Sequence, residues 1–190
     1  MYTMGSNIKD INFLFHKYYG DNPELRRIVT IHSQQVARKA LQIRDAKNLP
    51  LDPIDVFCAG MLHDIGVVKC SAPDIFAFGA LPYIRHGLEG KKILEKNGLN
   101  KYASICVTHT GAGISKENIK NNKIPLPIKD YLPTTLLEKL ICYCDKFYSK
   151  SHNLTQEKSV EQIITQLGKF GEDSVKRFLE LHELFNCDNK

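Results

Sequence analysis

The chain has 190 residues, 43% of them hydrophobic and 25% charged, which is an ordinary balance for one globular domain with a sizeable core. Its net charge of +5 comes without an Arg-rich arm, a zinc-finger pattern or an RNP pattern, so sequence-specific nucleic-acid binding is not expected. Because the sequence has no apolar run of about eighteen residues and no signal-peptide pattern, we expect a cytoplasmic protein without membrane association.

Helical periodicity dominates the chain, beginning with residues 8–19. Asn22-Pro23 and Asp52-Pro53 each place a capping residue before a proline, which is typical of a helix start. Thr135 and Glu138 form a capping-box pattern ahead of another helix. The remaining helices are expected over 23–47, 53–66, 82–97, 100–110, a short polar stretch within 114–133, 156–169 and 172–185.

The segment 70–81 mixes proline, glycine and aromatic residues, and we expect a loop or a short helix there. No alternation typical of β-strands is present, so the sequence predicts an all-α helical bundle in a single domain over residues 1–190. The two C-terminal helices carry apolar stripes that either pair between subunits, in a homodimer, or cap the same bundle.

Six residues that can bind a metal ion fall on helix ends or inward helix faces, in the order His32, His63, Asp64, His86, His109 and Asp145. Asp64 and Asp145 have apolar neighbours, where a carboxylate is costly to bury unless it is paired or bound to a cation. Mixed imidazole and carboxylate ligands favour Mn, Fe, Co, Ni or Zn over Ca or Mg. Taken singly, His32 would be a structural core histidine and Asp145 a salt-bridge partner; together they predict one or two open metal sites.

Asp64 is the central residue of this hypothesis, because a carboxylate can bridge two ions and can orient an attacking water molecule. We therefore treat Asp64 and the adjacent His63 as the candidate catalytic residues. The other histidines, His16, His152 and His182, lie on polar or terminal segments and are interpreted as surface residues.

The order of these residues, with HDIG at 63–66, resembles the HD-domain superfamily of metal-dependent phosphohydrolases. The stretch RHGLEGKKILEKNGL resembles the H-G-x-x-G helix of the subset with two extra histidines, which includes the symmetrical diadenosine-tetraphosphate hydrolases. VTHTGAGIS and LPTTLLEKLICYCDK resemble the small stand-alone predicted HD hydrolases of archaea and bacteria. The resemblance covers an HD core of about 23–150, on which helices within 151–187 are expected to pack.

The resemblance implies a division of the ligands between two metal ions. His32, His63, Asp64 and Asp145 would hold the first ion, and Asp64 would bridge to a second ion held by His86 and His109. Lys69 and Lys146 are candidate phosphate contacts, although Lys69 is displaced from the position of the lysine in related enzymes, since the sequence reads HDIGVVK rather than HDIGK. The GYP motif is absent, so cyclic-di-GMP is not the expected substrate.

The function expected from the resemblance is hydrolysis of a phosphoester or phosphoanhydride bond in a small molecule, with a nucleotide favoured, by attack of metal-bound hydroxide. The excess of lysines between Lys91 and Lys129 is either a solvated surface or an attraction for phosphate-bearing ligands. Two alternatives stay open. HD-type di-iron oxygenases share the same ligand set, and a non-catalytic domain could use the pocket to bind a nucleotide.

Overall fold

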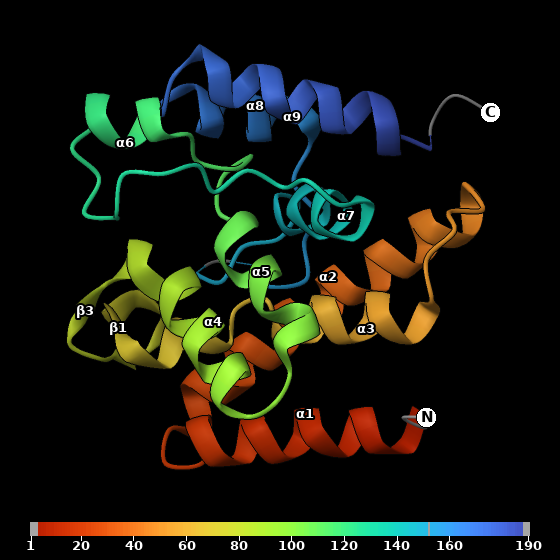
Figure 1. Ribbon diagram of the computed structural model, residues 1–190, viewed down its shortest axis with the longest axis vertical. Helices are drawn as coiled ribbons and strands as arrows, with labels where there is room; N and C mark the ends of the chain where they lie inside the picture. The colour runs from red at the N-terminus through yellow and green to blue at the C-terminus, as the bar shows by residue number, and fades with distance from the viewer. Residues whose placement is uncertain (1–3, 152, 188–190) are drawn as a thin grey trace.

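The computed structural model describes residues 4–151 and 153–187, which form nine α-helices and a small sheet (Figure 1). The α-helices are α1 Met4–Tyr19, α2 Pro23–Ala46, α3 Pro53–Leu62, α4 His86–Lys96, α5 Asn100–Thr108, α6 Lys116–Asn121, α7 Leu136–Asp145, α8 Val160–Gly168 and α9 Glu172–Phe185. The strands are β1 Cys70–Ala72, β2 Ala77–Phe78 and β3 Leu81–Pro82, and short 3-10 helices cover Ile65–Lys69, Pro73–Ile75 and Tyr83–Arg85. The predicted helical, single-domain fold is confirmed.

Helix starts follow the capping residues of the sequence. The Asn22 side chain accepts a hydrogen bond from the Leu25 amide at 3.0 Å, and the Asp52 side chain accepts one from the Ile54 amide at 2.7 Å. Thr135 and Glu138 form both hydrogen bonds of a capping box ahead of α7. Each cap satisfies amide groups that a helix leaves without internal partners, which is why these starts could be located from sequence.

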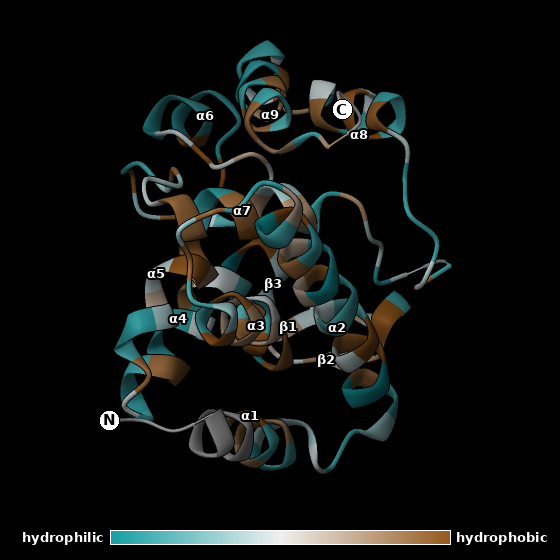
Figure 2. Cartoon of the chain, turned by 90° about the vertical axis from the view of Figure 1, so that its right-hand side faces the viewer, coloured by the Kyte–Doolittle hydropathy of each residue, from teal (hydrophilic) through white to brown (hydrophobic). Residues whose placement is uncertain are grey.

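The helices are arranged in three levels, with α2, α3, α4, α5 and α7 in the middle (Figure 1). Helix α1 covers one end of this group, while α8 and α9 cover the other. Hydrophobic and hydrophilic residues mix along the ribbons of α8 and α9 (Figure 2), and the hydrophobic residues Ile163, Phe178 and Phe185 of these helices are buried. Within the part of the chain that the structure describes, no helix has the length and apolar character needed to cross a membrane.

The segment after α3 differs from the prediction. Residues 70–81, expected as a loop or short helix, lie in a segment that forms a three-stranded sheet of order β2-β1-β3, and this sheet includes Pro82, where a helix was expected to begin. β1 pairs with β2 antiparallel, at Ser71↔Phe78, and with β3 parallel, at Cys70↔Leu81. Strands of two or three residues are too short to show alternation, so the sequence pattern could not reveal them.

Predicted helix boundaries also shift, and the helices expected from 82 and 156 begin at His86 and Val160. The helix expected over 53–66 ends at Leu62, and Ile65–Lys69 winds as a separate 3-10 helix. A side chain at Gly66 would place its Cβ 2.0 Å from the His86 carbonyl oxygen, so only glycine allows this segment to lie directly against the start of α4. The close approach brings the end of α3 next to His86.

Helix α9 is joined to the middle level through α7 and the loop before α6. The Phe178 ring stacks on Tyr143 of α7, with 5.8 Å between ring centroids. The Arg177 guanidinium donates hydrogen bonds to the carbonyl oxygens of Ala112 and Gly113 at 3.1 and 3.2 Å. These contacts fix the loop that follows His109.

Candidate metal centre

The structure brings the six predicted ligands together, although they come from five separate parts of the chain. His32 lies on the inward face of α2, while the others lie at helix ends: His63 and Asp64 directly after α3, His86 at the first residue of α4, His109 directly after α5 and Asp145 at the last residue of α7. All six are buried, with exposed fractions between 0% and 8%.

The first cluster consists of His32, His63, Asp64 and Asp145. His32 Nε2 lies 2.9 Å from Asp145 Oδ1, and His63 Nε2 lies 3.1 Å from Asp64 Oδ2. His32 Nε2 is also 3.3 Å from Asp64 Oδ2. One atom from each residue lies within 4.8 Å of the others, a spacing that a single cation could span.

The second cluster consists of Asp64, His86 and His109. Here the other carboxylate oxygen is involved: Asp64 Oδ1 lies 3.4 Å from His109 Nε2 and 3.5 Å from His86 Nε2. Asp64 therefore turns one oxygen toward each cluster, which is the arrangement of a carboxylate that bridges two cations.

Hydrogen bonds to the backbone fix three of the imidazole rings. Nδ1 of His63 lies 2.7 Å from the Gly60 carbonyl oxygen, Nδ1 of His86 lies 2.7 Å from that of Tyr83, and Nδ1 of His109 lies 3.1 Å from that of Ile105. Since a carbonyl oxygen only accepts, each Nδ1 carries the proton and a neutral ring presents a free lone pair at Nε2.

The donor atoms fit a bound cation. His86 Nε2 and His109 Nε2 are 3.0 Å apart, and two lone pairs at that distance repel unless a cation or a proton lies between them. Both oxygens of Asp64 are fully buried and lie 3.1–3.5 Å from imidazole Nε2 atoms, so that negative charge faces lone pairs, and Lys150 Nζ, 2.6 Å from Oδ2, offsets this at one oxygen. A divalent ion would satisfy both requirements, and the mixed nitrogen and oxygen donors match a transition metal.

Burial and charge set the protonation of the ligands. Burial lowers the pKa of His86 to about 3 and lowers that of His109, so both rings are neutral and able to bind metal. Burial also opposes the charged form of His63, but Asp64 and Asp145 outweigh it and raise its pKa to about 9. Burial alone would raise the pKa values of the two carboxyl groups, yet the nearby cations hold both well below the usual range.

The two predicted phosphate contacts are placed differently. Lys146 donates to Asp145 Oδ2 at 2.6 Å and to the His109 carbonyl oxygen at 3.0 Å, so its ammonium group lies at the centre. Lys69 is exposed at the end of its 3-10 helix, and within the described residues no hydrogen bond or ion pair joins it to the six ligands. The substrate-binding role of either lysine stays a prediction.

Lys150 was missed by sequence reasoning. Its Nζ lies 2.6 Å from Asp64 Oδ2 and 4.0 Å from Asp145 Oδ1. The residue follows α7 in an irregular segment, where neither periodicity nor a motif marks it. Its only sequence signal is its short distance along the chain from Asp145.

His16, interpreted as a surface residue, is exposed as expected. His182 is partly buried, with Nδ1 2.9 Å from the Tyr143 hydroxyl, so its interpretation as a surface residue is wrong. The packing of α9 on α7, which the sequence does not encode locally, explains the difference. His152 lies outside the described residues.

Two cavities are lined by residues that contact the ligands, although none of the six ligands lines either of them. A cleft of about 540 Å³ is lined by polar and aromatic residues, among them Tyr83, Tyr148, Lys150 and Lys158. The Tyr83 ring stacks on His86, with ring centroids 4.8 Å apart. A second, mainly apolar cavity of about 390 Å³ includes Thr110, whose hydroxyl lies 3.4 Å from His86 Nε2.

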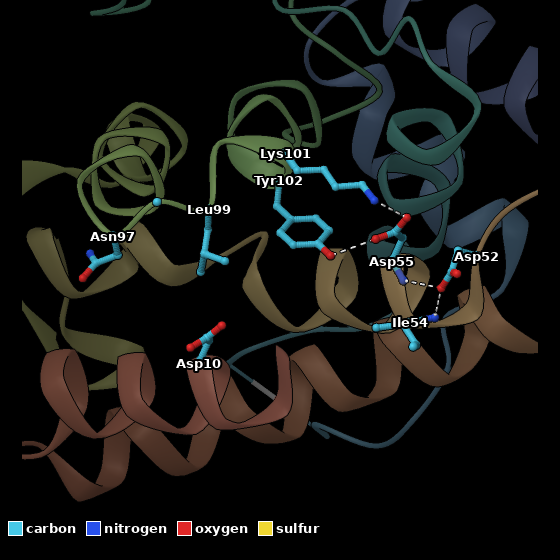
Figure 3. Close-up of a pocket in the computed structure, with 9 residues that line it drawn as sticks. Asp10, Asp52, Ile54, Asp55, Asn97, Leu99, Lys101 and Tyr102 are labelled. Carbon is cyan, nitrogen blue, oxygen red and sulfur yellow. Dashed lines mark hydrogen bonds and ion pairs between the residues drawn. The ribbon is translucent and has the colours of Figure 1, made fainter. Parts of the chain in front are cut away.

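A third cavity, of about 430 Å³, contains none of the six ligands (Figure 3). Its aspartates are Asp10, Asp52 and Asp55. Asp52 caps α3, and Asp55 accepts a hydrogen bond from the Tyr102 hydroxyl at 2.9 Å and pairs with Lys101. Two of the three carboxylates in this cavity, those of Asp52 and Asp55, therefore stabilise the fold.

A helical bundle with two buried His/Asp clusters that share one carboxylate defines a class of metal-binding domains. The model of the HD domain family matches residues 29–149, and the chain belongs to this family. The resemblance seen in the sequence is thereby confirmed.

Relatives of the chain fall into two kinds. An uncharacterized protein of Methanocaldococcus jannaschii is 32% identical over 155 residues, which are 81% of this chain and 83% of that protein. A tRNA (cytidine(56)-2'-O)-methyltransferase of Picrophilus torridus is 29% identical over 82% of this chain, and one of Thermoplasma volcanium is 28% identical over 78% of it. The chain spans only 41% and 39% of the length of these two methyltransferases. No solved structure matches the chain.

Proposed function

We propose that this chain is a metal-dependent phosphohydrolase, which cleaves a phosphoester or phosphoanhydride bond of a small molecule. The observation that carries the proposal is the Asp64 carboxylate, which turns one oxygen toward each ligand cluster. Two metal ions bridged by one carboxylate would suit a reaction in which negative charge develops on phosphoryl oxygens.

The proposed cofactor is one or two divalent transition metal ions, chosen from Mn, Fe, Co, Ni and Zn. When bound, such ions withdraw charge from a phosphoryl group and lower the pKa of coordinated water. His32, His63, Asp64 and Asp145 would hold one ion, and Asp64, His86 and His109 the other. The shared carboxylate favours two ions over one.

The protein side chains would orient the reactants. Asp64 lies between the clusters and can accept a hydrogen bond from the attacking water molecule, while His63 is held beside it by the Gly60 carbonyl oxygen. Lys146 adds a positive charge next to Asp145 and can stabilise charge on the phosphate group. Lys69 is exposed and would contact a phosphate group only of a substrate large enough to extend to it.

We favour a nucleotide or another small phosphorylated molecule over folded RNA. The name of the two methyltransferases specifies tRNA, but the chain spans only a part of their length, so methyl transfer is not carried over. The six ligands are at most 8% exposed, and a small molecule reaches such a depth more easily than a duplex. The lysine-rich surface would attract any phosphate-bearing ligand.

The test compares the purified native protein with Asp64→Asn and with Asp21→Asn, an exposed aspartate that serves as the control. Metal content is measured together with phosphate release from nucleotides, dinucleoside polyphosphates and an aryl phosphate. We expect metal-dependent release by the native protein and by the control, and a loss of more than about 100-fold in Asp64→Asn, because second-sphere changes alone cost 10–100-fold.

Other outcomes would replace the proposal. Equal metal content in all three proteins would remove Asp64 from the site. Two bound irons with oxygen uptake and no phosphate release would favour the oxygenase chemistry that shares this ligand set. Nucleotide binding without turnover would favour a non-catalytic binding domain.

A further inference from the structure

Lys150 places a cation against the carboxylate that both ligand clusters share. Its side chain is only 14% exposed, and its Nζ lies 2.6 Å from Asp64 Oδ2. The ammonium group also interacts with the Tyr83 side chain and lies 4.0 Å from Asp145 Oδ1. The long side chain of Lys150 is thus positioned by Asp64, Asp145 and Tyr83.

With its histidines in the neutral form that binds a metal, which requires His63 to lose its proton, the charges of the other side chains at the centre balance without the ion. Asp64 and Asp145 supply two negative charges, and Lys146 and Lys150 supply two positive charges at 2.6 Å from them. Each divalent ion would therefore leave an excess of two positive charges in a buried place, where water screens them poorly. An anion with at least two negative charges would restore the balance, and a phosphate dianion is such an anion.

The oxygen atoms nearest Lys150 are also ligand atoms of the first cluster. Asp64 Oδ2 lies 3.1 Å from His63 Nε2, and Asp145 Oδ1 lies 2.9 Å from His32 Nε2. Since an ammonium group and a divalent ion repel each other at such short distances, a bound ion weakens the hold of these carboxylates on Lys150. The ammonium group then needs another anionic partner on its open side.

The open side of Lys150 is the cleft of about 540 Å³. Besides Lys150, the cleft is lined by Lys158 and by the hydroxyl-bearing residues Ser71, Ser149 and Tyr83, with Asp74 as its acid. Ammonium and hydroxyl groups are the donors that phosphate oxygens require. The volume lies within the range of small-ligand pockets and is sufficient for a nucleotide.

We propose that Lys150 binds the phosphate group of the substrate at the end of this cleft, next to the shared carboxylate. The ligand class is a phosphate monoester or a terminal phosphate with two negative charges. This assignment rests on the proposed function. It predicts that metal binding and phosphate binding are coupled through Lys150, so that each ligand strengthens the binding of the other.

The experiment measures binding of inorganic phosphate to the Mn²⁺-loaded protein by calorimetry, and binding of Mn²⁺ with and without phosphate. The proteins are the native form, Lys150→Met, Lys150→Arg and the control Lys176→Met, which changes an exposed lysine of α9. In the native protein and the control, phosphate is expected to tighten Mn²⁺ binding. In Lys150→Met, phosphate affinity should fall at least tenfold and the coupling should disappear, while Mn²⁺ alone binds more tightly.

The outcomes separate this assignment from the proposed function. Native-like phosphate affinity in a folded Lys150→Met would make Lys150 a structural ion pair and overturn the assignment. If Lys150→Met does not fold, Lys150→Arg provides the test. Its longer guanidinium group should change the affinity for phosphate, and an unchanged affinity would overturn the assignment of Lys150. A native protein that binds phosphate through Lys150 but hydrolyses no phosphorylated compound would sink the proposed function alone.

Discussion

Asp64 carries a full negative charge into a place with no solvent exposure, at the point where α3 ends. Burial of a carboxylate without partners is strongly unfavourable, and here Lys150, His63, His109 and His32 form a network around it. A residue in this position is costly for folding alone. The benefit of Asp64 lies in metal binding, because its two oxygens point in different directions and give each ligand cluster one negatively charged donor.

At this scale the two clusters can be separated by one substitution. His86→Ala removes a ligand of the second cluster and leaves the first cluster of four residues complete. We expect metal content to fall from two ions to one, with hydrolysis reduced by at least about 100-fold. Elemental analysis and phosphate release would measure this, with the exposed His16→Ala as the control. If His86→Ala lost both ions, or neither, the two clusters would not bind metal independently.

Helix α7 is the element that carries Asp145, and its start is fixed by Glu138. The Glu138 carboxylate accepts hydrogen bonds from the Thr134 and Thr135 amides at 2.9 and 3.0 Å. Burial would raise the pKa of Glu138, but hydrogen bonds from Ser104, Thr135 and Thr134 lower it overall. A carboxyl group with a lowered pKa in the folded state stabilises the fold above its unfolded pKa, and this contribution is lost as the pH falls.

The cap therefore predicts a pH-dependent effect of Glu138→Gln. Above about pH 5 the variant should be less stable than the native protein by about 1 kcal/mol, because neutral hydrogen bonds replace charge-assisted ones. Below about pH 4 the difference should begin to shrink, because the unfolded state takes up the proton first and the folded carboxyl group, whose pKa is lowered, follows only at lower pH. Denaturant unfolding of the metal-free proteins between about pH 3.5 and 7 measures it, with the exposed Glu183→Gln as the control. A constant difference would show that charge is not involved.

At the scale of the whole molecule, a bound metal would join helices from every part of the middle level. Since the ligands converge only in the folded chain, metal binding should stabilise the fold. At a metal concentration about a thousandfold above Kd, the gain is about 4 kcal/mol. For a chain of this length, roughly 2–4 °C are expected per kcal/mol, so a chelator should lower Tm by roughly 8–16 °C.

Thermal unfolding with and without chelator checks this expectation, and Asp64→Asn provides the comparison. The variant lacks the shared ligand, so its Tm should respond to the chelator much less than that of the native protein. A native Tm that does not change on chelation would mean that the centre is too weak to matter for stability.

The sequence predicted what depends on local signals. Caps such as Asn22 and Thr135 marked helix starts, and the HDIG motif with its spaced histidines identified the six residues that the structure brings together. What it could not reveal depends on contacts between distant segments. Strands of two or three residues show no periodicity, and Lys150 reaches Asp64 only because the chain after α7 turns back toward α3. The direction of each Asp64 oxygen likewise follows from packing alone.

The separation of His32 and Asp145 along the chain also has a consequence for synthesis. Their side chains are 2.9 Å apart, although 113 positions separate them in the sequence. At about 5–20 residues per second, the ribosome adds Asp145 roughly 6–23 s after His32. The nascent chain therefore exposes single imidazoles before any complete ligand set exists. Loading of the first cluster must therefore follow translation of α7, whereas the second cluster, whose last ligand is His109, is complete earlier.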